Sequence, residues 1–295
     1  MKKLLLFLFL LTESVIGLAQ DHGKLFYNEY WVTTRRDSAY YYRVWTKSGD
    51  NYEIHDYYND GTPLLSGYLS SLDDNYWPNR VGHFVYFDKA TARKICEGDY
   101  KSGRKNGVWK YYEADRETVA TSVVFASDMR TRQVSFYSDG KTVSIDADYE
   151  LGKKVKAKSY YDNGKLHNER EYANGVTRFE HCYGIGGEDT SCDKDTARYV
   201  EQMPKPSFSL GSYLGDNIHY PEVARLKGIT GRVVVEFVVM EDGTISTALV
   251  SQSVYPAIDE EALRVVAAMP KWSPGRQNGK TVKVLYSQPV TFALE

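Results

Sequence analysis

The sequence predicts an α+β protein: an elongated N-terminal array of antiparallel β-hairpins, then a small C-terminal domain in which helices pack on a three-stranded sheet. The chain has 295 residues, which is enough for two domains of ordinary size. Its 25 tyrosines favour sheet-rich structure. One pattern repeats over residues 21–183, whereas residues 207–295 carry both strand and helix signals. These two regions are therefore predicted to be separate domains.

Residues 1–19 are predicted to be a signal peptide. Lys2 and Lys3 form its basic start, and Leu4–Leu11 forms an apolar core. Gly17-Leu18-Ala19 supplies the small residues of a cleavage site ahead of Gln20. The apolar run is shorter than the ~20 residues that span a bilayer. Cleavage would give an exported, periplasmic protein, whereas an uncleaved segment would anchor the chain in the inner membrane.

Paired aromatic residues recur along residues 21–183. Their second members are separated by 29, 25, 25 and 24 residues and lie at Tyr58, Phe87, Tyr112, Tyr137 and Tyr161. A fixed period of this size indicates a repeat array. Most of the pairs precede Asn/Asp-Gly turn residues, so each unit is predicted to be a strand, a turn and a second strand. The rings are interpreted as the core of the array, and the alternative is an exposed strip that binds a glycan or a partner.

One repeat carries a family resemblance. Lys105-Asn106-Gly107-Val108-Trp109-Lys110-Tyr111-Tyr112 is similar to the repeat of MORN-like proteins, including the bacterial antitoxin-component family. The resemblance implies a meander of hairpins with aromatic rings stacked along one face. A second hypothesis is that the array is a periplasmic scaffold or a glycan-binding rod and that the C-terminal domain is a docking tag.

Residues 184–206 are predicted to be a loop and a Pro-containing linker. In an oxidising compartment, Cys182 and Cys192 are close enough in sequence to pair across a Gly-rich loop, although both can equally be free thiols like Cys96. The His181-Cys182 pair fits no usual zinc spacing, so no metal site is predicted. No cofactor motif is present in the sequence.

The C-terminal domain, residues 207–295, is predicted from a series of local signals. A short helix begins at Pro221, and a strand follows Gly231. Asp242-Gly243 forms a tight hairpin turn into a second strand, Ile245–Val250. Pro256–Met269 has one apolar face and is predicted to be the main helix, which Pro270 ends.

Two details of this domain bear on its surface. The acidic residues Asp259-Glu260-Glu261 are interpreted as helix-dipole and solubility features. Val282–Phe292 is predicted to be a third strand beside the first, which gives the sheet order 2-1-3. Pro289 favours an edge position for this strand, because proline has no N–H to donate. Trp272 is expected to cover the layer between helix and sheet.

These elements together resemble the C-terminal domain of the TonB family from about residue 204 to residue 295. The motif residues are Tyr220, Pro221, Gly231, Asp242, Gly243, Pro270 and Trp272. The resemblance implies an adaptor like the TonB energy transducer, which acts in transmembrane transport. Its partner would be an outer-membrane transporter or another envelope protein, joined by inner-membrane motor proteins if the N-terminal segment is uncleaved.

Binding is expected by strand addition along the free edge of the third strand. The predicted partner-binding residues are Val282, Lys283, Val284, Leu285, Tyr286, Ser287 and Gln288. The same edge could pair with a second copy in a homodimer.

Other function classes find no support in the sequence. The net charge is −2 and the basic residues are spread along the chain, which excludes a basic nucleic-acid footprint. The histidines are scattered and no nucleophile lies in a recognisable catalytic motif, so no enzyme is predicted. The six histidines are His22, His55, His83, His167, His181 and His219.

Overall fold

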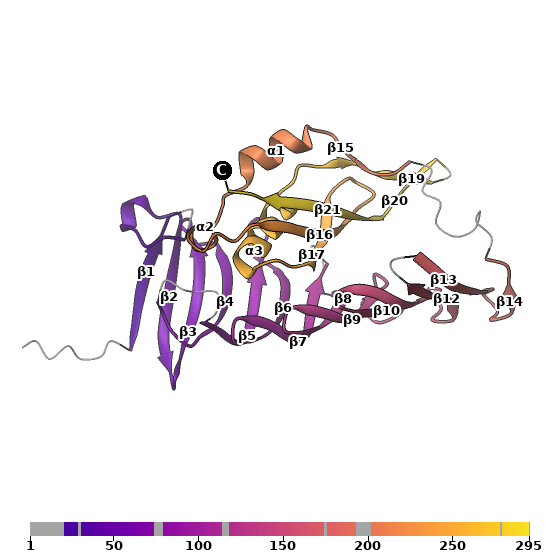
Figure 1. Cartoon of the computed structure of the whole chain (residues 1–295), viewed down its shortest axis with the longest axis horizontal. Helices are drawn as coiled ribbons and strands as arrows, with labels where there is room; N and C mark the ends of the chain where they lie inside the picture. The colour runs from indigo at the N-terminus through magenta and orange to yellow at the C-terminus, as the bar shows by residue number, and fades with distance from the viewer. Residues whose placement is uncertain are drawn as a thin grey trace, which may run out of the picture.

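The computed structural model describes residues 21–28, 31–73, 79–113, 118–173, 176–192, 202–277 and 279–294. The predicted signal peptide and its cleavage site lie outside these residues. Within the described ranges, no helix combines the length and the apolarity needed to cross a membrane. The predicted α+β fold class is confirmed, because a long β-hairpin array precedes a small mixed domain (Figure 1).

The array is one antiparallel sheet of 14 strands, in which each strand is hydrogen-bonded to its neighbours in sequence. A short 3-10 helix, Arg36–Ser38, follows the first strand. The strands are β1 (His22–Tyr27), β2 (Tyr41–Ser48), β3 (Asn51–Tyr58), β4 (Pro63–Leu69), β5 (Arg80–Phe87), β6 (Lys94–Lys101), β7 (Arg104–Tyr112), β8 (Val119–Ala126), β9 (Met129–Phe136), β10 (Val143–Glu150), β11 (Lys153–Tyr160), β12 (Leu166–Ala173), β13 (Val176–Tyr183) and β14 (Asp189–Thr190).

The period of the sequence repeat is one pair of strands. Tyr58, Phe87 and Tyr112 end β3, β5 and β7, while Tyr137 and Tyr161 directly follow β9 and β11. The aromatic pairs thus mark the same end of successive hairpins, where the polar turns begin. The similarity to MORN-like repeats stays a prediction.

One face of the array is a row of buried aromatic and aliphatic side chains. Glycine in one strand makes room for a ring from the next. A Cβ atom on Gly98 would lie 2.4 Å from the ring of Trp109, and one on Gly67 would lie 2.6 Å from Phe84. Trp109 and Phe84 are fully buried. Most of the rings therefore form a core, as the sequence indicated for the array.

The described residues of the C-terminal domain form three helices and three small sheets. A three-stranded sheet has the order β17-β16-β21, so the predicted order 2-1-3 is confirmed. Two further sheets pair β15 with β18 and β19 with β20. The elements are β15 (Lys205–Pro206), α1 (Leu210–Asn217), α2 (Glu222–Leu226), β16 (Gly231–Val239), β17 (Ile245–Gln252), α3 (Pro256–Ala267), β18 (Trp272–Ser273), β19 (Gly275–Gln277), β20 (Lys280–Val282) and β21 (Val284–Phe292).

The helices pack on one face of this sheet. Alternate residues of β16, among them Val235 and Phe237, are fully buried against Ile258 and Ala262 of α3. The Tyr213 hydroxyl of α1 donates to the carbonyl of Val265, which ties α1 to α3. Buried residues that alternate along the strand thus pack against buried residues that recur about every 3.6 positions along the helix, and together they form one core.

The C-terminal domain lies on the aromatic face of the array. Leu249 of β17 belongs to the same buried cluster as Trp109 and Phe84. β17 lies next to the array and β21 lies farther from it (Figure 1). A single-layer sheet exposes both faces, so this domain supplies the second layer that buries the rings.

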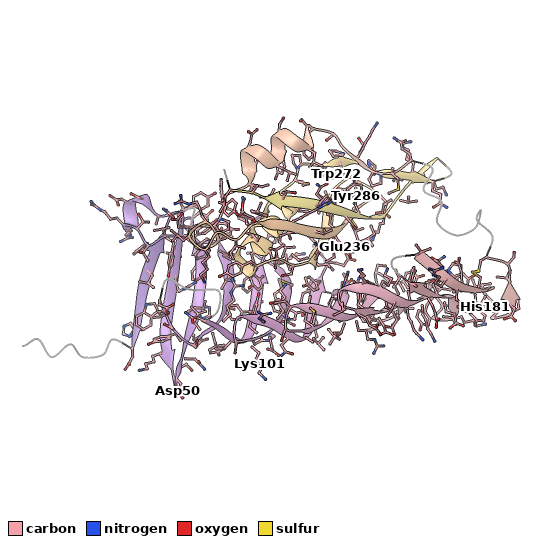
Figure 2. The ribbon with its side chains drawn as sticks, viewed as in Figure 1. Asp50, Lys101, His181, Glu236, Trp272 and Tyr286 are labelled. Carbon is pink, nitrogen blue, oxygen red and sulfur yellow. A yellow bond between two sulfur atoms is a disulfide. The ribbon has the colours of Figure 1, made fainter. Side chains whose placement is uncertain are left out.

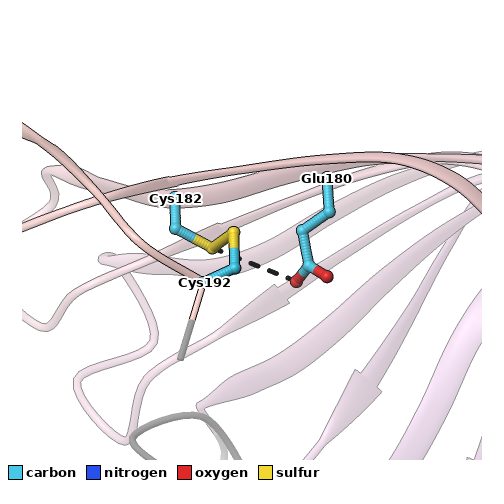
Figure 3. Close-up of side chains that lie close together, drawn as sticks. All are labelled: Glu180, Cys182 and Cys192. Atoms are coloured by element: carbon cyan, nitrogen blue, oxygen red, sulfur yellow. Dashed lines mark hydrogen bonds between the residues drawn. A yellow bond between two sulfur atoms is a disulfide. The ribbon is translucent and has the colours of Figure 1, made fainter. Parts of the chain in front are cut away.

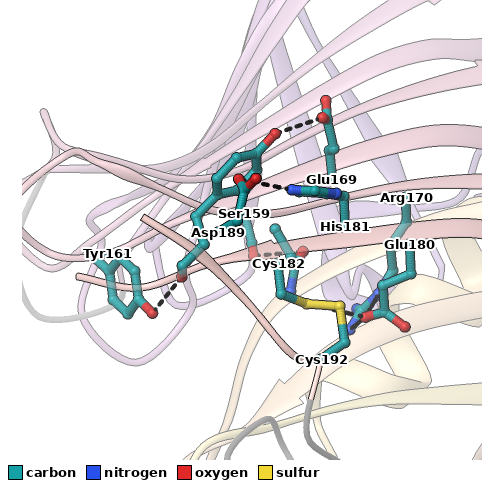
Figure 4. The surroundings of a disulfide bond; sticks show 11 residues. Ser159, Tyr161, Glu169, Arg170, Glu180, His181, Cys182, Asp189 and Cys192 are labelled. Atoms are coloured by element: carbon teal, nitrogen blue, oxygen red, sulfur yellow. Dashed lines mark hydrogen bonds and ion pairs between the residues drawn. A yellow bond between two sulfur atoms is a disulfide. The ribbon is translucent and has the colours of Figure 1, made fainter. Parts of the chain in front are cut away.

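The last strands of the array are held by a disulfide between Cys182 in β13 and Cys192 (Figure 3). Glu180 lies beside it, but the two sulfur atoms are bonded to each other and are not thiolate ligands for a metal. On the face of β13 opposite the disulfide, the Nε2 atom of His181 lies 3.1 Å from the Oδ1 atom of Asp189 in β14 (Figure 4). The segment expected to be a loop and linker, residues 184–206, thus also contains β14 and β15.

Candidate docking edge

The candidate site is the outer edge of β21. β16 is the strand that pairs with β21 in the described parts of the chain, and the pairing is antiparallel over the whole strand. The expected edge position of this strand is therefore observed. Val282 and Lys283 lie before β21, since Val282 pairs with Gly275 in the β19–β20 hairpin. The third strand is therefore shorter than the predicted Val282–Phe292 by these two residues.

The backbone groups of β21 alternate between β16 and the free edge. Pro289 lies opposite Val234, whose carbonyl accepts from the Ser251 hydroxyl on the β17 side. Val234 therefore directs its backbone groups away from β21, and Pro289 directs its own to the free edge. By alternation, Leu285 and Ser287 also present N–H and C=O groups to the free edge.

The open part of the edge is the start of β21. The Gln288 side chain donates to the carbonyl of Pro289 at 2.7 Å, so this carbonyl already has a partner. Pro289 has no N–H, and the edge is thus least receptive at this point. Leu285 is 54% exposed and Ser287 is exposed. Val284–Ser287 is therefore the stretch most open to an added strand.

Aromatic rings in the core of the domain pack against the same stretch of β21. Tyr286 lies 4.9 Å from Trp272 and 5.7 Å from Phe237, measured between ring centroids. Trp272 is 3% exposed and covers the core between helix and sheet, where Figure 2 shows it beside Tyr286. The rings hold β21 in register, so the outward backbone groups of Leu285 and Ser287 are pre-positioned.

Gly243, one of the motif residues, lies so close to the backbone of Trp272 that no side chain fits there. Its backbone has φ +84°, and an added Cβ would lie 2.1 Å from the carbonyl oxygen of Trp272. Its own carbonyl accepts from the Trp272 N–H at 2.8 Å. The neighbouring Asp242 accepts from Lys271, and this contact lowers the pKa of Asp242. The Asp242-Gly243 turn thus fixes the segment that leads towards β21.

Three other motif residues, Tyr220, Pro221 and Gly231, lie at the far end of the domain. The ring of Tyr220 packs at 85° on Phe292, the last residue of β21, and its hydroxyl donates to the Ile229 carbonyl. Pro221 is the N-cap of α2. A Cβ atom on Gly231 would meet the Val254 side chain. These residues hold both ends of the central strands and do not contact the open edge.

The acidic residues at the start of α3 are not solubility features. Asp259 accepts from the Val254 N–H at 3.0 Å, and Glu261 accepts from the His219 N–H at 2.6 Å. Glu260 pairs with Arg80 of β5. Asp259 lies in the first turn of α3, as the helix-dipole interpretation expects. The contacts of Asp259 and Glu261 lie within the C-terminal domain, whereas Glu260 reaches the array. Burial raises the pKa of Asp259 to about 6.

In the described parts of the chain, two salt bridges join the array to the domain, and neither was predicted. Arg80 donates to Glu260 at 2.9 Å, and Arg130 of β9 donates to Glu236 of β16 at 3.0 Å. Figure 2 places Glu236 on the side of the domain that faces the array. Arg80 lies opposite Leu69, with no acidic residue across the strand. Arg80 is a charged residue at an inward-facing strand position. That position was the one sequence signal that it needs a counter-charge from outside the sheet.

Comparison with protein families matches residues 216–294 to the model described as the Gram-negative bacterial TonB protein C-terminal. A search of the curated proteins finds no match. Similar solved structures include TarM and a mutant of S. aureus TarM in complex with Fondaparinux, alpha-GlcNAc-glycerol and UDP. They are 18% identical, with TM-scores of 0.26 and 0.27, over 32% of this chain and 19% of theirs. This chain spans about a fifth of their length, and the likeness carries no argument about fold or activity.

The family match agrees with the motif residues and the sheet order described above. The matched model describes the C-terminal part of a protein of Gram-negative bacteria. Residues 216–294 of this chain therefore match the C-terminal domain of the Gram-negative bacterial TonB protein, and they follow an array of β-hairpins.

Proposed function

We propose that this protein is an exported envelope adaptor whose C-terminal domain binds an extended segment of an outer-membrane transporter by strand addition to β21. The observation that carries the proposal is the open backbone edge at Leu285 and Ser287. In β-augmentation, main-chain hydrogen bonds supply much of the affinity, and side-chain pockets add specificity.

The other sheet edges are less open to such a partner. At the β1 edge, the Thr34 N–H donates to the Phe26 carbonyl at 2.9 Å, so a folded loop already pairs there. At the opposite end of the array, β14 is only two residues long and adjoins the disulfide. Short or covered edges discourage strand addition. The longer edge of β21 is turned away from the array and is the better template.

The array has the role of a support in this proposal. Because it buries Leu249 and pairs with Glu236 and Glu260, it covers the β17 side of the domain and leaves the β21 side outward. A glycan-binding strip on the same aromatic face would compete with the C-terminal domain for those rings. The docked arrangement therefore favours the adaptor over the glycan-binding rod.

The expected affinity is modest. Leu285 and Ser287 offer two N–H and two C=O groups to a partner strand. Each hydrogen bond contributes about 0.5–1.5 kcal/mol net, and ordering a flexible segment opposes this gain. Energy coupling would additionally require an N-terminal segment retained in the inner membrane and contact with motor proteins there. With cleavage near Gln20, the protein binds its partner without pulling on it.

Photocrosslinking in cells tests the proposal. A crosslinking amino acid at position 285 should capture a defined set of envelope proteins that includes an outer-membrane transporter. A second copy of this chain as the sole product would instead indicate a homodimer through β21. The matched control is position 108, because Val108 is 52% exposed on the face of the array opposite Trp109. Equal products from both positions would contradict docking at β21.

Proline substitutions test the edge itself. Leu285→Pro removes an outward N–H and should abolish partner capture while the circular dichroism spectrum is retained. Val284→Pro removes an N–H that faces β16, so it should unfold the domain. Strand addition at β21 is excluded if Leu285→Pro stays folded and captures the partner as well as the parent does.

A further inference from the structure

Ionisable side chains from both domains meet where α3 lies on the array. We call them the interface cluster: Arg80 of β5, Lys105 of β7 and Asp128 of the turn after β8 from the array, with Asp259 and Glu260 of α3 from the domain. Glu260 contacts Arg80 directly, while Lys105 and Asp128 act on Asp259 through their charges. The two domains thus share one group of charges.

The array brings both a cation and a carboxylate to this cluster. The Lys105 ammonium lies 4.4 Å from the centroid of the Trp109 ring and donates to the Tyr111 hydroxyl at 3.5 Å. The carboxylate of Asp128 accepts from the backbone N–H of Lys105 at 2.7 Å. Burial raises the pKa of Asp128, so this carboxylate is already costly to keep charged.

The domain adds Asp259, a buried carboxylate that lacks a counter-charge in contact with it. Asp259 is 9% exposed, and it accepts from the Ser253 hydroxyl and from the Val254 N–H. Within the described parts of the chain, no cation forms a salt bridge with it, whereas the neighbouring Glu260 is paired with Arg80. Docking therefore places an unpaired carboxylate near Asp128, which has the same charge.

The interface cluster as a whole has an excess of negative charge. Its three carboxylates face two cations, as the definition above shows. The neighbouring pairs Arg130–Glu236 and Glu261–Arg264 are each neutral and do not change this balance. An excess charge shielded from water is relieved when one carboxylate binds a proton.

We propose that the C-terminal domain docks on the array with uptake of one proton at Asp259, so that acid favours the docked arrangement and a rising pH favours release of the domain. The carboxylate takes this proton from water and becomes a neutral carboxyl group. The cluster is then balanced, with Arg80 still paired to Glu260 and Lys105 beside Asp128. The proposal goes beyond the adaptor function and does not depend on what the domain binds.

The direction of the effect follows from the proton balance. Burial raises the pKa of Asp259 from 3.8 to about 6 in the docked protein. Docking is therefore tightest below pH 4, weakens as the pH rises to about 6, and no longer changes above that value. For a single proton, the equilibrium constant for docking changes by at most about tenfold for each pH unit.

Other titratable groups at the interface need separate consideration. Burial raises the pKa of Cys96 to about 11 and that of Tyr111 to about 12, so both stay neutral in this range. Arg104 also acts on Asp128, but it is exposed and keeps its charge. Histidine titrates close to this range, and the backbone N–H of His219 donates to Glu261. His219 is therefore tested by its own variant.

The test measures the distance between the domains in the full chain by electron–electron double resonance. Spin labels are attached to Lys110→Cys on the array and Leu226→Cys on α2, both exposed positions, in a Cys96→Ala background. Samples between pH 4 and pH 8 contain urea below the unfolding transition, and circular dichroism checks that both domains stay folded. We expect one docked distance at pH 4 and a growing fraction of longer distances up to about pH 6.

Matched variants identify the group that binds the proton. Asp259→Asn should keep the domain docked at every pH, because its amide is neutral like the protonated acid. Asp216→Asn, at an exposed position on α1, and His219→Gln should both retain the pH dependence of the parent. A docked distance alone at every pH in the parent, or a pH dependence that survives in Asp259→Asn, would overturn the proposal. Loss of the pH dependence in His219→Gln would also overturn it, since His219 would then be the titrating group.

Discussion

Arg80 of the array and Glu260 of α3 form a salt bridge between residues that are 180 positions apart in the sequence. The Arg80 side chain is fully buried and also donates to the Tyr100 hydroxyl at 3.0 Å. The pair fixes the acidic end of the C-terminal domain on the array. It thereby helps to decide which edge of the TonB-like sheet faces outward.

Breaking this pair should destabilise the docked protein. Glu260→Gln leaves the guanidinium of Arg80 buried without its counter-charge, and we expect a loss of about 2–3 kcal/mol in the free energy of unfolding. Urea denaturation followed by tryptophan fluorescence measures it. The control is Asp146→Asn, which breaks an exposed pair with Arg132 and should cost less than about 1 kcal/mol. Equal losses in the two variants would show that the interdomain pair is not specially important.

Trp109→Ala tests the aromatic core of the array. The side chain is fully buried, and its Nε1 donates to the Asp99 carbonyl at 3.1 Å. We expect a loss of about 3–5 kcal/mol in unfolding free energy. Val108→Ala, one residue away on the exposed face, should change it by less than about 1 kcal/mol. A loss for Trp109→Ala within measurement error would mean that the ring is accessible to a ligand.

The disulfide should stabilise the end of the array locally. Cys182 and Cys192 are 10 positions apart, and a closed loop of this size stabilises by about 2–3 kcal/mol in the chain-entropy model. Cys192→Ser should therefore increase amide hydrogen exchange in β12 and β13. Exchange in β5–β7 should stay unchanged, because strands in such an array contact only near neighbours. Increased exchange throughout the array would contradict this local role.

The pH dependence of stability should carry the signature of Asp259. Its pKa is raised from 3.8 to about 6 because burial disfavours the charged carboxylate. The folded state then binds more protons than the unfolded state between pH 4 and pH 6, so the contribution of Asp259 to stability falls as the pH rises through this window. Above pH 6 the contribution of Asp259 to stability no longer changes with pH.

Asp259→Asn should remove this fall, so the stability difference between variant and parent should change between pH 4 and pH 6 and then stay constant. Urea denaturation at several pH values measures the difference. Asp242→Asn is the control of opposite sign, since the pKa of Asp242 is lowered and its stabilising contribution is lost as the pH falls below 4. If the difference in stability between Asp259→Asn and the parent does not vary with pH, the pKa of Asp259 is not raised.

The start of the mature protein can be measured directly. Intact mass of the exported protein should correspond to a chain that begins at or within a few residues of Gln20. Recovery of a chain with Met1 in the inner-membrane pellet would show that the segment is retained. The protein could then couple to inner-membrane motor proteins.

Local signals carried much of the fold. The aromatic pairs at 24–29-residue spacing predicted the hairpin array, and the array indeed places each pair at the end of alternate strands. Pro289 and the hairpin turn at Asp242-Gly243 predicted the sheet order and the edge strand. These inferences succeeded because turn chemistry and strand alternation act between neighbouring residues.

The boundary of the docking edge was less predictable. Val282–Phe292 reads as one continuous strand, yet Lys283 separates β20 from β21 and Val282 pairs with Gly275. The β-forming side chains are similar on both sides of this break. Pairing with β19 or with β16 depends on partners that come from other parts of the chain, so local propensity does not locate the break.

The sequence by itself determined the α+β fold class and the hairpin array, because both follow from local periodicity and turn residues, whereas the C-terminal domain was identified by its resemblance to the TonB family. Only the tertiary structure decided that the domain lies on the aromatic face of the array, with Arg80 paired to Glu260 and Arg130 to Glu236. The physical reason is that a charge inside an apolar layer needs a counter-charge in contact with it. The packing of the two domains decides which distant residue supplies that charge, and local sequence patterns contain no information about it.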